Sequence, residues 1–479
     1  MLNAIIVVVY FAILVGLGYL GMRKTRTLGD FFLGGRTLGP WITAFAYGTT
    51  YFSAVLIVGF AGKIGWGFGF DSMWIVVGNT LIGTTLAWLL LARRTRNMSY
   101  RLNAMTMPQF LGARFDSQFL KVGSALIIFV FLLPYSASVF MGLSYLFEVN
   151  LHIPYFWAVV AMGIGTAIYL VMGGYHAIAL TDLFQGIIMV GGAVLMVFFV
   201  LSAAGGLAAV QTELPVRYAQ HVPNPGGFIG ILPLVLLTSL GPLGLPQMVQ
   251  KFYAIKNEAV IRTGLIVATA FSLLMSFAAY FTGSMSHLFF DKLPQGGPDL
   301  LVPTLIAQVL PATLATVVLL LVLSASMSTL SSLILVSSSS VAMDLFAGVL
   351  RPGSRQETVT VLMRALCALF IALSMAIAIA QPAIIVSLMS MSWGTVAGSF
   401  IAPYAYGLFW KRTTRAGAIA GMLSGLLIAV SLNIILGTAQ SPLAGAIAMI
   451  APLFVVPAVS LVTQPMPSKH VETAFVTVE

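Results

Sequence analysis

Charged residues are scarce in this chain of 479 residues. Only 8% are Asp, Glu, Lys or Arg, whereas 59% are hydrophobic and the mean hydropathy is +1.02. This composition excludes a soluble domain and indicates a polytopic membrane protein. The lone cysteine, Cys367, excludes an intrachain disulfide. The five histidines are scattered and no HExxH motif occurs, so we expect neither a metalloenzyme nor other catalytic residues.

Apolar runs recur along the whole chain, each long enough to cross a hydrocarbon layer of about 30 Å. They predict thirteen spans, near 3–21, 40–70, 71–92, 119–147, 153–172, 180–202, 228–250, 259–286, 305–343, 358–380, 383–409, 415–436 and 443–462. The runs at 40–70 and 305–343 are longer than a bilayer requires. We therefore expect them to be tilted, broken or extended beyond the membrane.

Positive charge is distributed unevenly between the predicted loops. With the N-terminus outside, all but three of the 23 Lys and Arg residues fall on the inner side; the exceptions are Lys63, Arg217 and Lys292. This bias predicts an inner (plasma) membrane protein with a cytoplasmic C-terminus. The net charge of +10 then reflects topology and requires no nucleic-acid partner. Lys251 belongs to the inner group, and we expect no Lys or Arg within the inner spans.

Two predicted spans contain residues that oppose a continuous helix. The second has Gly48 beside Thr49 and Thr50, and the seventh contains Pro233, Gly241, Pro242, Gly244 and Pro246. Unpaired backbone at membrane depth is tolerated only against protein or a water-filled cavity. Each break opens a set of five spans, and a repeat with an odd number of spans must be inverted. This pattern favours a secondary transporter, with simple structural kinks as the alternative.

Hydroxyl groups line one face of the ninth span. Ser324, Ser328, Ser331 and Ser332 are spaced for one helical face, and Thr329 flanks it. Oxygen ligands suit a hard cation, so the face predicts a cation site. The alternative is that these hydroxyls satisfy carbonyls of their own turns where helices pack closely.

Among the thirteen Asp and Glu residues, Asp182 alone opens an apolar helix from the inner side. It is either a functional carboxylate or a helix cap. Proton relays need several buried titratable groups, and the only such neighbour in sequence is His176. Sodium is therefore favoured over protons as the coupling ion.

Several motifs then resemble the sodium:solute symporter family, whose members carry proline, pantothenate, monocarboxylates, sialic acid or sugars. They are Gly173-Gly174 followed by Thr181-Asp182 and Gln185, Leu33-Gly34-Gly35-Arg36, Met107-Pro108 with Phe110, and Ser328-Thr329-Leu330-Ser331-Ser332. The resemblance implies an all-α transport domain with the LeuT-like 5+5 inverted repeat, about thirteen transmembrane helices and alternating access. It divides the chain into an extra helix (1–21), two repeats (40–202 and 228–409), two C-terminal helices (415–462) and a cytoplasmic tail (463–479).

The same resemblance implies the site residues. A first sodium ion would be held by the carbonyls of Thr49, Phe52 and Ala325 and the hydroxyls of Ser328 and Thr329. A possible second sodium ion would use Asp182, Ser331 and Ser332 together with Ser328, unless Asp182 only organises the first site. The substrate pocket would be lined by Tyr47, Thr50, Ser53, Tyr135, Thr238, Gly241, Pro242 and Trp393.

These pocket residues narrow the substrate class. The predicted lining has no side-chain amide or charge, which disfavours a sugar, whereas helix N-termini could receive a carboxylate. Tyr51 stands where the proline carriers have an aspartate, and Thr238 and Pro242 replace two of their aromatics. We therefore expect a small monocarboxylate, pantothenate or a similar solute, carried by a functional monomer in the lipid bilayer. Proline, an ion channel and a proton-coupled carrier are the alternatives.

Overall fold

The computed structural model describes residues 2–24, 28–222 and 226–475. Within these ranges the chain is helical and forms no strand, and Leu38 and Ile255 make only an isolated bridge. Ten of the described helices are long and apolar enough to cross a membrane, and three shorter apolar helices lie at Val8–Gly21, Tyr155–Ile168 and Pro298–Val309. The predicted all-α polytopic class is confirmed, while the number of spans stays a prediction.

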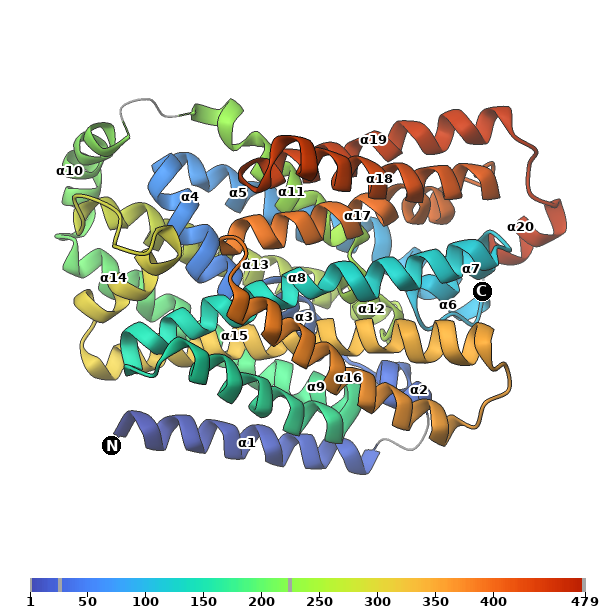
Figure 1. Ribbon diagram of the computed structural model, residues 1–479, viewed down its shortest axis with the longest axis horizontal. Helices are drawn as coiled ribbons and strands as arrows, with labels where there is room; N and C mark the ends of the chain where they lie inside the picture. Colours follow the sequence, from blue (N-terminus) through green and yellow to red (C-terminus); the bar gives the residue numbers. More distant parts are fainter. Residues whose placement is uncertain (1, 25–27, 223–225, 476–479) are drawn as a thin grey trace.

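The long helices run side by side along the long axis of the molecule, and the two termini lie at opposite ends (Figure 1). The N-terminal part contains α1 (Leu2–Lys24), α2 (Leu28–Leu33), η1 (Gly34–Arg36), α3 (Pro40–Tyr51), η2 (Val55–Phe60), α4 (Ala61–Phe68), η3 (Gly69–Ser72), α5 (Met73–Gly78), η4 (Asn79–Leu86), η5 (Trp88–Ala92), α6 (Arg93–Arg101), α7 (Met107–Arg114), α8 (Gln118–Leu151), α9 (Tyr155–Ala203) and α10 (Gly206–His221).

The C-terminal part contains α11 (Gly227–Gly244), α12 (Pro246–Tyr253), α13 (Ala259–Met285), η6 (Ser286–Leu288), η7 (Pro298–Leu300), α14 (Leu301–Val309), α15 (Ala312–Ser339), η8 (Ser340–Leu350), α16 (Gln356–Ala380), α17 (Ile385–Phe409), α18 (Arg415–Leu436), η9 (Thr438–Gln440), α19 (Ser441–Val462) and α20 (Ser468–Phe475). In Figure 1, α10 and α14 lie at one end of the bundle and α2, α6, α7 and α20 at the other. We call the latter the basic end, because α6 carries Arg93, Arg94, Arg96 and Arg101.

Both predicted helix breaks are present. After α3 the chain is extended at Phe52 (φ −111°, ψ 120°) before it turns helical again. After α11 it is extended at Leu245 (φ −77°, ψ 123°), and α12 begins with Pro246. Proline is well tolerated there, because the backbone N–H of a residue in the first turn makes no hydrogen bond within the helix, so its absence costs nothing. The second interruption therefore coincides with Gly244 and Pro246, whereas the first falls at Phe52, four residues after Gly48, which itself lies within α3.

The long run at 305–343 divides differently from its predicted bounds. Leu310 is extended (φ −93°, ψ 137°) and separates α14 from α15, which continues through η8 to Leu350. Leu310 precedes Pro311, and a residue before proline is restricted to extended conformations. The predicted span had joined the end of α14 to α15, because both are apolar.

The signature glycine Gly174 bends α9. Its backbone (φ 58°, ψ −159°) lies in a region that favours glycine, and a Cβ here would lie 2.9 Å from the Phe31 carbonyl oxygen. The bend falls between the spans predicted at 153–172 and 180–202. Asp182 lies about two turns beyond it, inside the second half of the helix, so it is not a helix cap.

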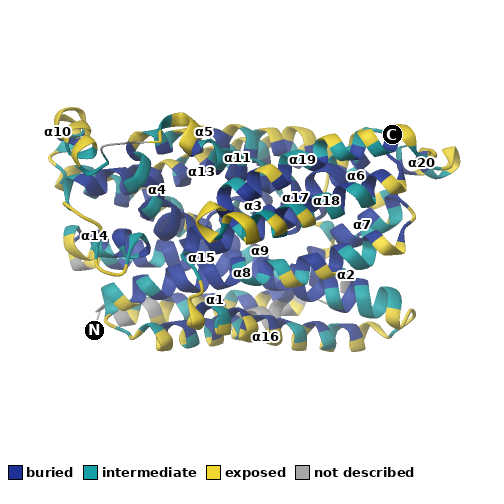
Figure 2. Cartoon of the chain, turned by 45° about the horizontal axis from the view of Figure 1, so that its top comes forward, coloured by how far each residue is buried: buried dark blue, intermediate teal, exposed yellow. Residues whose placement is uncertain are grey.

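The centre of the bundle is formed by α15 and α17. In the most apolar stretch of each helix, 89% of the residues are buried in α15 and 94% in α17, against 22% in α18. Figure 2 shows the same contrast between a buried interior and an outer layer with many exposed residues. That layer exposes large apolar side chains such as Ile434, Phe454 and Val462, as a lipid-facing surface does. The serine-rich face of α15 is therefore turned toward protein.

Candidate cation and substrate sites

Backbone oxygens of the α3 break meet the hydroxyl face of α15. The Thr329 hydroxyl oxygen lies 3.0 Å from the Ala325 carbonyl oxygen, and 3.1 and 3.3 Å from the carbonyl oxygens of Thr49 and Thr50. The Thr329 hydroxyl is therefore within contact distance of two of the other four oxygens predicted for a first sodium ion. A further predicted residue, Phe52, is the extended residue of the break.

The Ser328 hydroxyl lies beside this group. It is 2.7 Å from Thr49 Oγ1 and donates to Asp182 Oδ1 at 2.6 Å. Ser328, Thr329 and Thr49 are all fully buried. A buried cluster of neutral carbonyl and hydroxyl oxygens suits a monovalent cation that must also be released. The residues present thus fit a sodium ion at this place.

Asp182 faces a lysine that sequence patterns did not place there. Lys251, on α12, has a side chain with 0% exposure, and its Nζ lies 3.6 Å from Asp182 Oδ2. Nζ also donates to Ser332 Oγ at 2.9 Å and lies 5.2 Å from the centre of the Tyr175 ring. The expectation that no Lys or Arg lies within the inner spans is therefore wrong.

The reason for this error is the short length of α12. Its eight residues read as the end of an apolar run followed by a basic loop, yet all eight are buried. The available signal was the run of polar residues Gln247, Gln250 and Lys251 directly after Pro246, which is unusual for a lipid-facing segment.

The remaining residues predicted for a second sodium ion make other contacts. Ser332 Oγ lies 2.9 Å from Thr50 Oγ1 in addition to its bond from Lys251. Ser331 donates to the Met327 carbonyl of its own turn at 2.6 Å, as hydroxyls in membrane helices often do.

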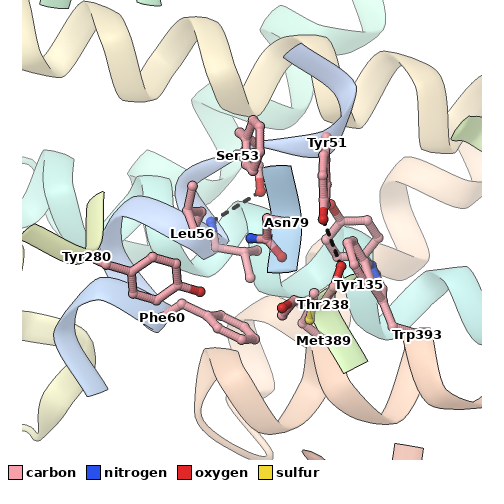
Figure 3. Close-up of a pocket in the computed structure, with 12 residues that line it drawn as sticks. Tyr51, Ser53, Leu56, Phe60, Asn79, Tyr135, Thr238, Tyr280, Met389 and Trp393 are labelled. Carbon is pink, nitrogen blue, oxygen red and sulfur yellow. Dashed lines mark hydrogen bonds between the residues drawn. The ribbon is translucent and has the colours of Figure 1, made fainter. Parts of the chain in front are cut away.

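A small pocket, with a cavity volume of about 20 Å³, lies next to the α3 break (Figure 3). It is lined by Tyr51, Phe52, Ser53, Val55, Leu56, Phe60, Asn79, Tyr135, Thr238, Tyr280, Met389 and Trp393. Four of the eight predicted substrate residues are among them: Ser53, Tyr135, Thr238 and Trp393. Within the described chain, this lining contains no charged side chain.

The other four predicted substrate residues lie outside the lining. Tyr47 donates its hydroxyl to the Gly83 carbonyl at 2.6 Å, and Thr50 pairs with Ser332. Gly241 packs behind Trp393, because a Cβ there would lie 2.4 Å from the indole ring. Pro242 is buried in α11 without lining the pocket.

Three polar residues of the pocket were not predicted: Tyr51 on α3, Asn79 on η4 and Tyr280 on α13. The Tyr51 hydroxyl donates to the Thr238 carbonyl at 2.7 Å. In the part of the chain that the structure describes, Asn79 Oδ1 and the Tyr280 hydroxyl have no hydrogen-bond partner although both are buried. In Figure 3 the Tyr280 hydroxyl points into the pocket. Buried polar atoms are normally paired, so these two atoms suggest contact with a polar ligand. A lone asparagine in the apolar run 71–92 was the available signal.

A sequence model of the sodium:solute symporter family matches residues 31–425. The chain belongs to this family. Membership confirms the predicted family and sodium as its coupling ion. The symporter is 29% identical to a sodium/proline symporter of Salmonella typhimurium over 435 residues, with 88% of this chain and 86% of the relative covered. It is 30% identical to a sodium/proline symporter of Staphylococcus aureus over 457 residues, with coverages of 89% and 85%.

Solved structures confirm the LeuT-like fold of the symporter. A substrate-bound, outward-open Na+-coupled sialic acid symporter aligns with a TM-score of 0.78 at 18% identity, covering 97% of this chain and 98% of that one. A nucleobase-cation-symport-1 family transporter, closed with bromovinylhydantoin bound, aligns with a TM-score of 0.55 at 15% identity, covering 93% and 97%.

Proposed function

We propose that this symporter imports a small zwitterion or monocarboxylate together with sodium by alternating access. The proposal is carried by the α3 break, whose consecutive residues contribute both to the predicted sodium site and to the pocket. Thr49 and Thr50 direct carbonyl oxygens to Thr329, while the next residues, Tyr51, Phe52 and Ser53, line the pocket. Because the ion and the solute would contact consecutive residues of one unwound segment, binding of either would order that segment for the other.

The pocket supports a compact solute. Its cavity volume is about 20 Å³, room for about one water molecule, so the lining must open to admit even a compact solute. The Tyr280 hydroxyl can donate to a carboxylate and Asn79 Oδ1 can accept from an amine, and both lack partners in the described structure. Aromatic walls suit an apolar body between these groups, and a hexose would leave most of its hydroxyls facing Phe60, Val55 and Met389.

Proline is the first solute to test. The relatives named sodium/proline symporters cover most of this chain, and proline is both zwitterionic and compact. Tyr51 and Thr238, two positions where this sequence departs from proline carriers, both lie in the pocket and favour short monocarboxylates as the second candidate.

We propose the first sodium site at Thr49, Phe52, Ala325, Ser328 and Thr329. The substrate site comprises Ser53, Tyr135, Thr238 and Trp393 with Asn79 and Tyr280. The basic end faces the cytoplasm, consistent with the positive-inside rule, and the N-terminus lies outside. The symporter acts as a monomer.

The test is thermal stability of the purified protein in sodium or potassium chloride, with proline, pantothenate, short monocarboxylates, sialic acid and hexoses. A ligand at a hundred times its dissociation constant stabilises by about 2.7 kcal/mol. We expect sodium to stabilise the protein, and one small carboxylate to add stability only when sodium is present. Equal stability in sodium and potassium with every solute would refute sodium coupling.

A further inference from the structure

The ion pair of Lys251 and Asp182 differs from the others in the described chain. Four ion pairs are present there, and the partners of the other three are between 39% and 94% exposed. Lys251 and Asp182 are both 0% exposed. Exposed pairs contribute little to stability, whereas a charge taken fully out of water requires a compensating partner.

We infer that the ammonium of Lys251 takes the place of a second sodium ion, so that this symporter binds one sodium ion per cycle. The inference rests on the proposed sodium coupling. It concerns Asp182, Ser331 and Ser332, the set that a second sodium ion would use. The structure shows a cation of the chain itself among these residues.

The ammonium faces two of the oxygens that a second sodium ion needs, one through a hydrogen bond and one through charge alone. Lys251 Nζ donates to Ser332 Oγ at 2.9 Å and lies 3.6 Å from Asp182 Oδ2, which accepts no hydrogen bond in the described chain. The face of the Tyr175 ring lies 5.2 Å from Nζ, a distance at which an aromatic ring attracts a cation. Carboxylate, hydroxyl and ring thus enclose the ammonium. The residues present do not fit sodium here in addition to Lys251.

Charge balance leads to the same conclusion. One carboxylate and one ammonium leave the buried group neutral, and the remaining contacts of Asp182 and Ser332 are to the neutral hydroxyls of Ser328 and Thr50. A sodium ion bound to Asp182 and Ser332 would contact the same two side chains as the ammonium, and two like charges so close together at a buried position repel strongly. A sodium ion in place of the ammonium would restore neutrality.

The first sodium site stays available in this arrangement. Lys251 contacts Ser332, one turn beyond Ser328 on α15, and Ser328 separates Asp182 from the Thr49 side of the break. The ammonium therefore neutralises the charge of Asp182. Among the described hydrogen bonds it makes none to Thr329 or Ala325. A cation carried on α12 also remains with the protein when the transported ion leaves.

The experiment counts sodium ions on purified full-length protein by equilibrium binding of radioactive sodium, and measures the Hill coefficient of sodium-dependent thermal stability. Potassium chloride keeps ionic strength constant. The variants are Lys251→Met, which removes the ammonium, and Lys251→Met with Asp182→Asn, which removes both charges. Lys256→Met is the matched control, because Lys256 is exposed and follows shortly after α12.

We expect the wild type and Lys256→Met to bind one sodium ion with a Hill coefficient near one. Lys251→Met should bind a second ion and depend more steeply on sodium, and the double variant should return to one ion. Two ions on the wild type would overturn the inference. So would a Lys251→Met protein that binds no more sodium than the double variant, or that unfolds in sodium while the double variant folds. A wild type that binds no sodium, with Lys251→Met still gaining one ion, would instead refute the proposed function.

Discussion

Replacing Thr329 with valine tests the first sodium site directly. The substitution keeps the shape of the side chain and removes a hydroxyl that lies 3.0 to 3.3 Å from three carbonyl oxygens. A hydrogen bond or ligand contact to a charged group is worth about 1.5–3 kcal/mol. Loss of about 2 kcal/mol corresponds to about 30-fold weaker sodium binding.

This loss is measurable as a change in stability. At a sodium concentration a hundred times the wild-type dissociation constant, the wild type gains about 2.7 kcal/mol, whereas a variant with about 30-fold weaker binding gains about 0.9 kcal/mol. The assay is a thermal-shift titration with sodium at constant total salt, followed by sodium-dependent uptake in proteoliposomes.

Thr395→Val is the matched control for this experiment. Thr395 is equally buried, and its hydroxyl donates only to the Met391 carbonyl of its own turn among the described bonds. We expect its sodium dependence to equal that of the wild type. An unchanged sodium midpoint for Thr329→Val, or an equal loss for both variants, would refute the site.

Three further predictions concern the pocket, the packing and the ion pair. Tyr280→Phe should weaken solute binding about 10-fold, the effect of one lost hydrogen bond, and leave sodium binding in the absence of solute unchanged; an unaltered solute affinity would remove Tyr280 from the site. Gly283→Ala should destabilise the protein by about 1–3 kcal/mol, because a Cβ there would lie 1.9 Å from the Ala61 carbonyl oxygen, whereas Gly191→Ala, with open space around it, should not; equal melting temperatures would contradict this. Asp182→Asn should cost about 3–5 kcal/mol by leaving Lys251 unpaired, and the loss should largely disappear when Lys251 is also changed to Met, as thermal unfolding of both variants will show.

Sequence patterns predicted the elements whose signals are local. Gly244 and Pro246 predicted the break between α11 and α12, and the residues around Gly48 predicted the break after α3. Sequence patterns failed where a helix boundary lies inside an apolar run. Leu310 ends α14 because Pro311 follows it, yet the apolar pattern predicts one long span across this boundary.

The candidate site was predicted where residues are close in sequence and missed where the fold brings distant residues together. Ser328 and Thr329 share a helical face that periodicity makes visible. Lys251 and Asp182 are far apart in sequence, and nothing local shows that α12 carries its lysine to α9. Tyr47 shows the converse: it lies one turn from Thr50, but its ring stacks on Phe252 and its hydroxyl bonds to Gly83 instead of facing the pocket.

If Lys251 replaces a second sodium ion, as we infer, the replacement affects how steeply this carrier could concentrate its solute. With a zwitterionic solute and one sodium ion, one net charge crosses the membrane in each cycle. At 100 mV this charge contributes about 2.3 kcal/mol, which sustains a concentration ratio of about 50-fold before the sodium gradient adds its share. A second transported cation would square that ratio to about 2,500-fold. When the second positive charge is a lysine of the protein, it is not transported, and each solute molecule enters with one sodium ion. Such a carrier is therefore suited to solutes that are abundant outside the cell, where a low ionic cost per molecule matters more than a high final ratio.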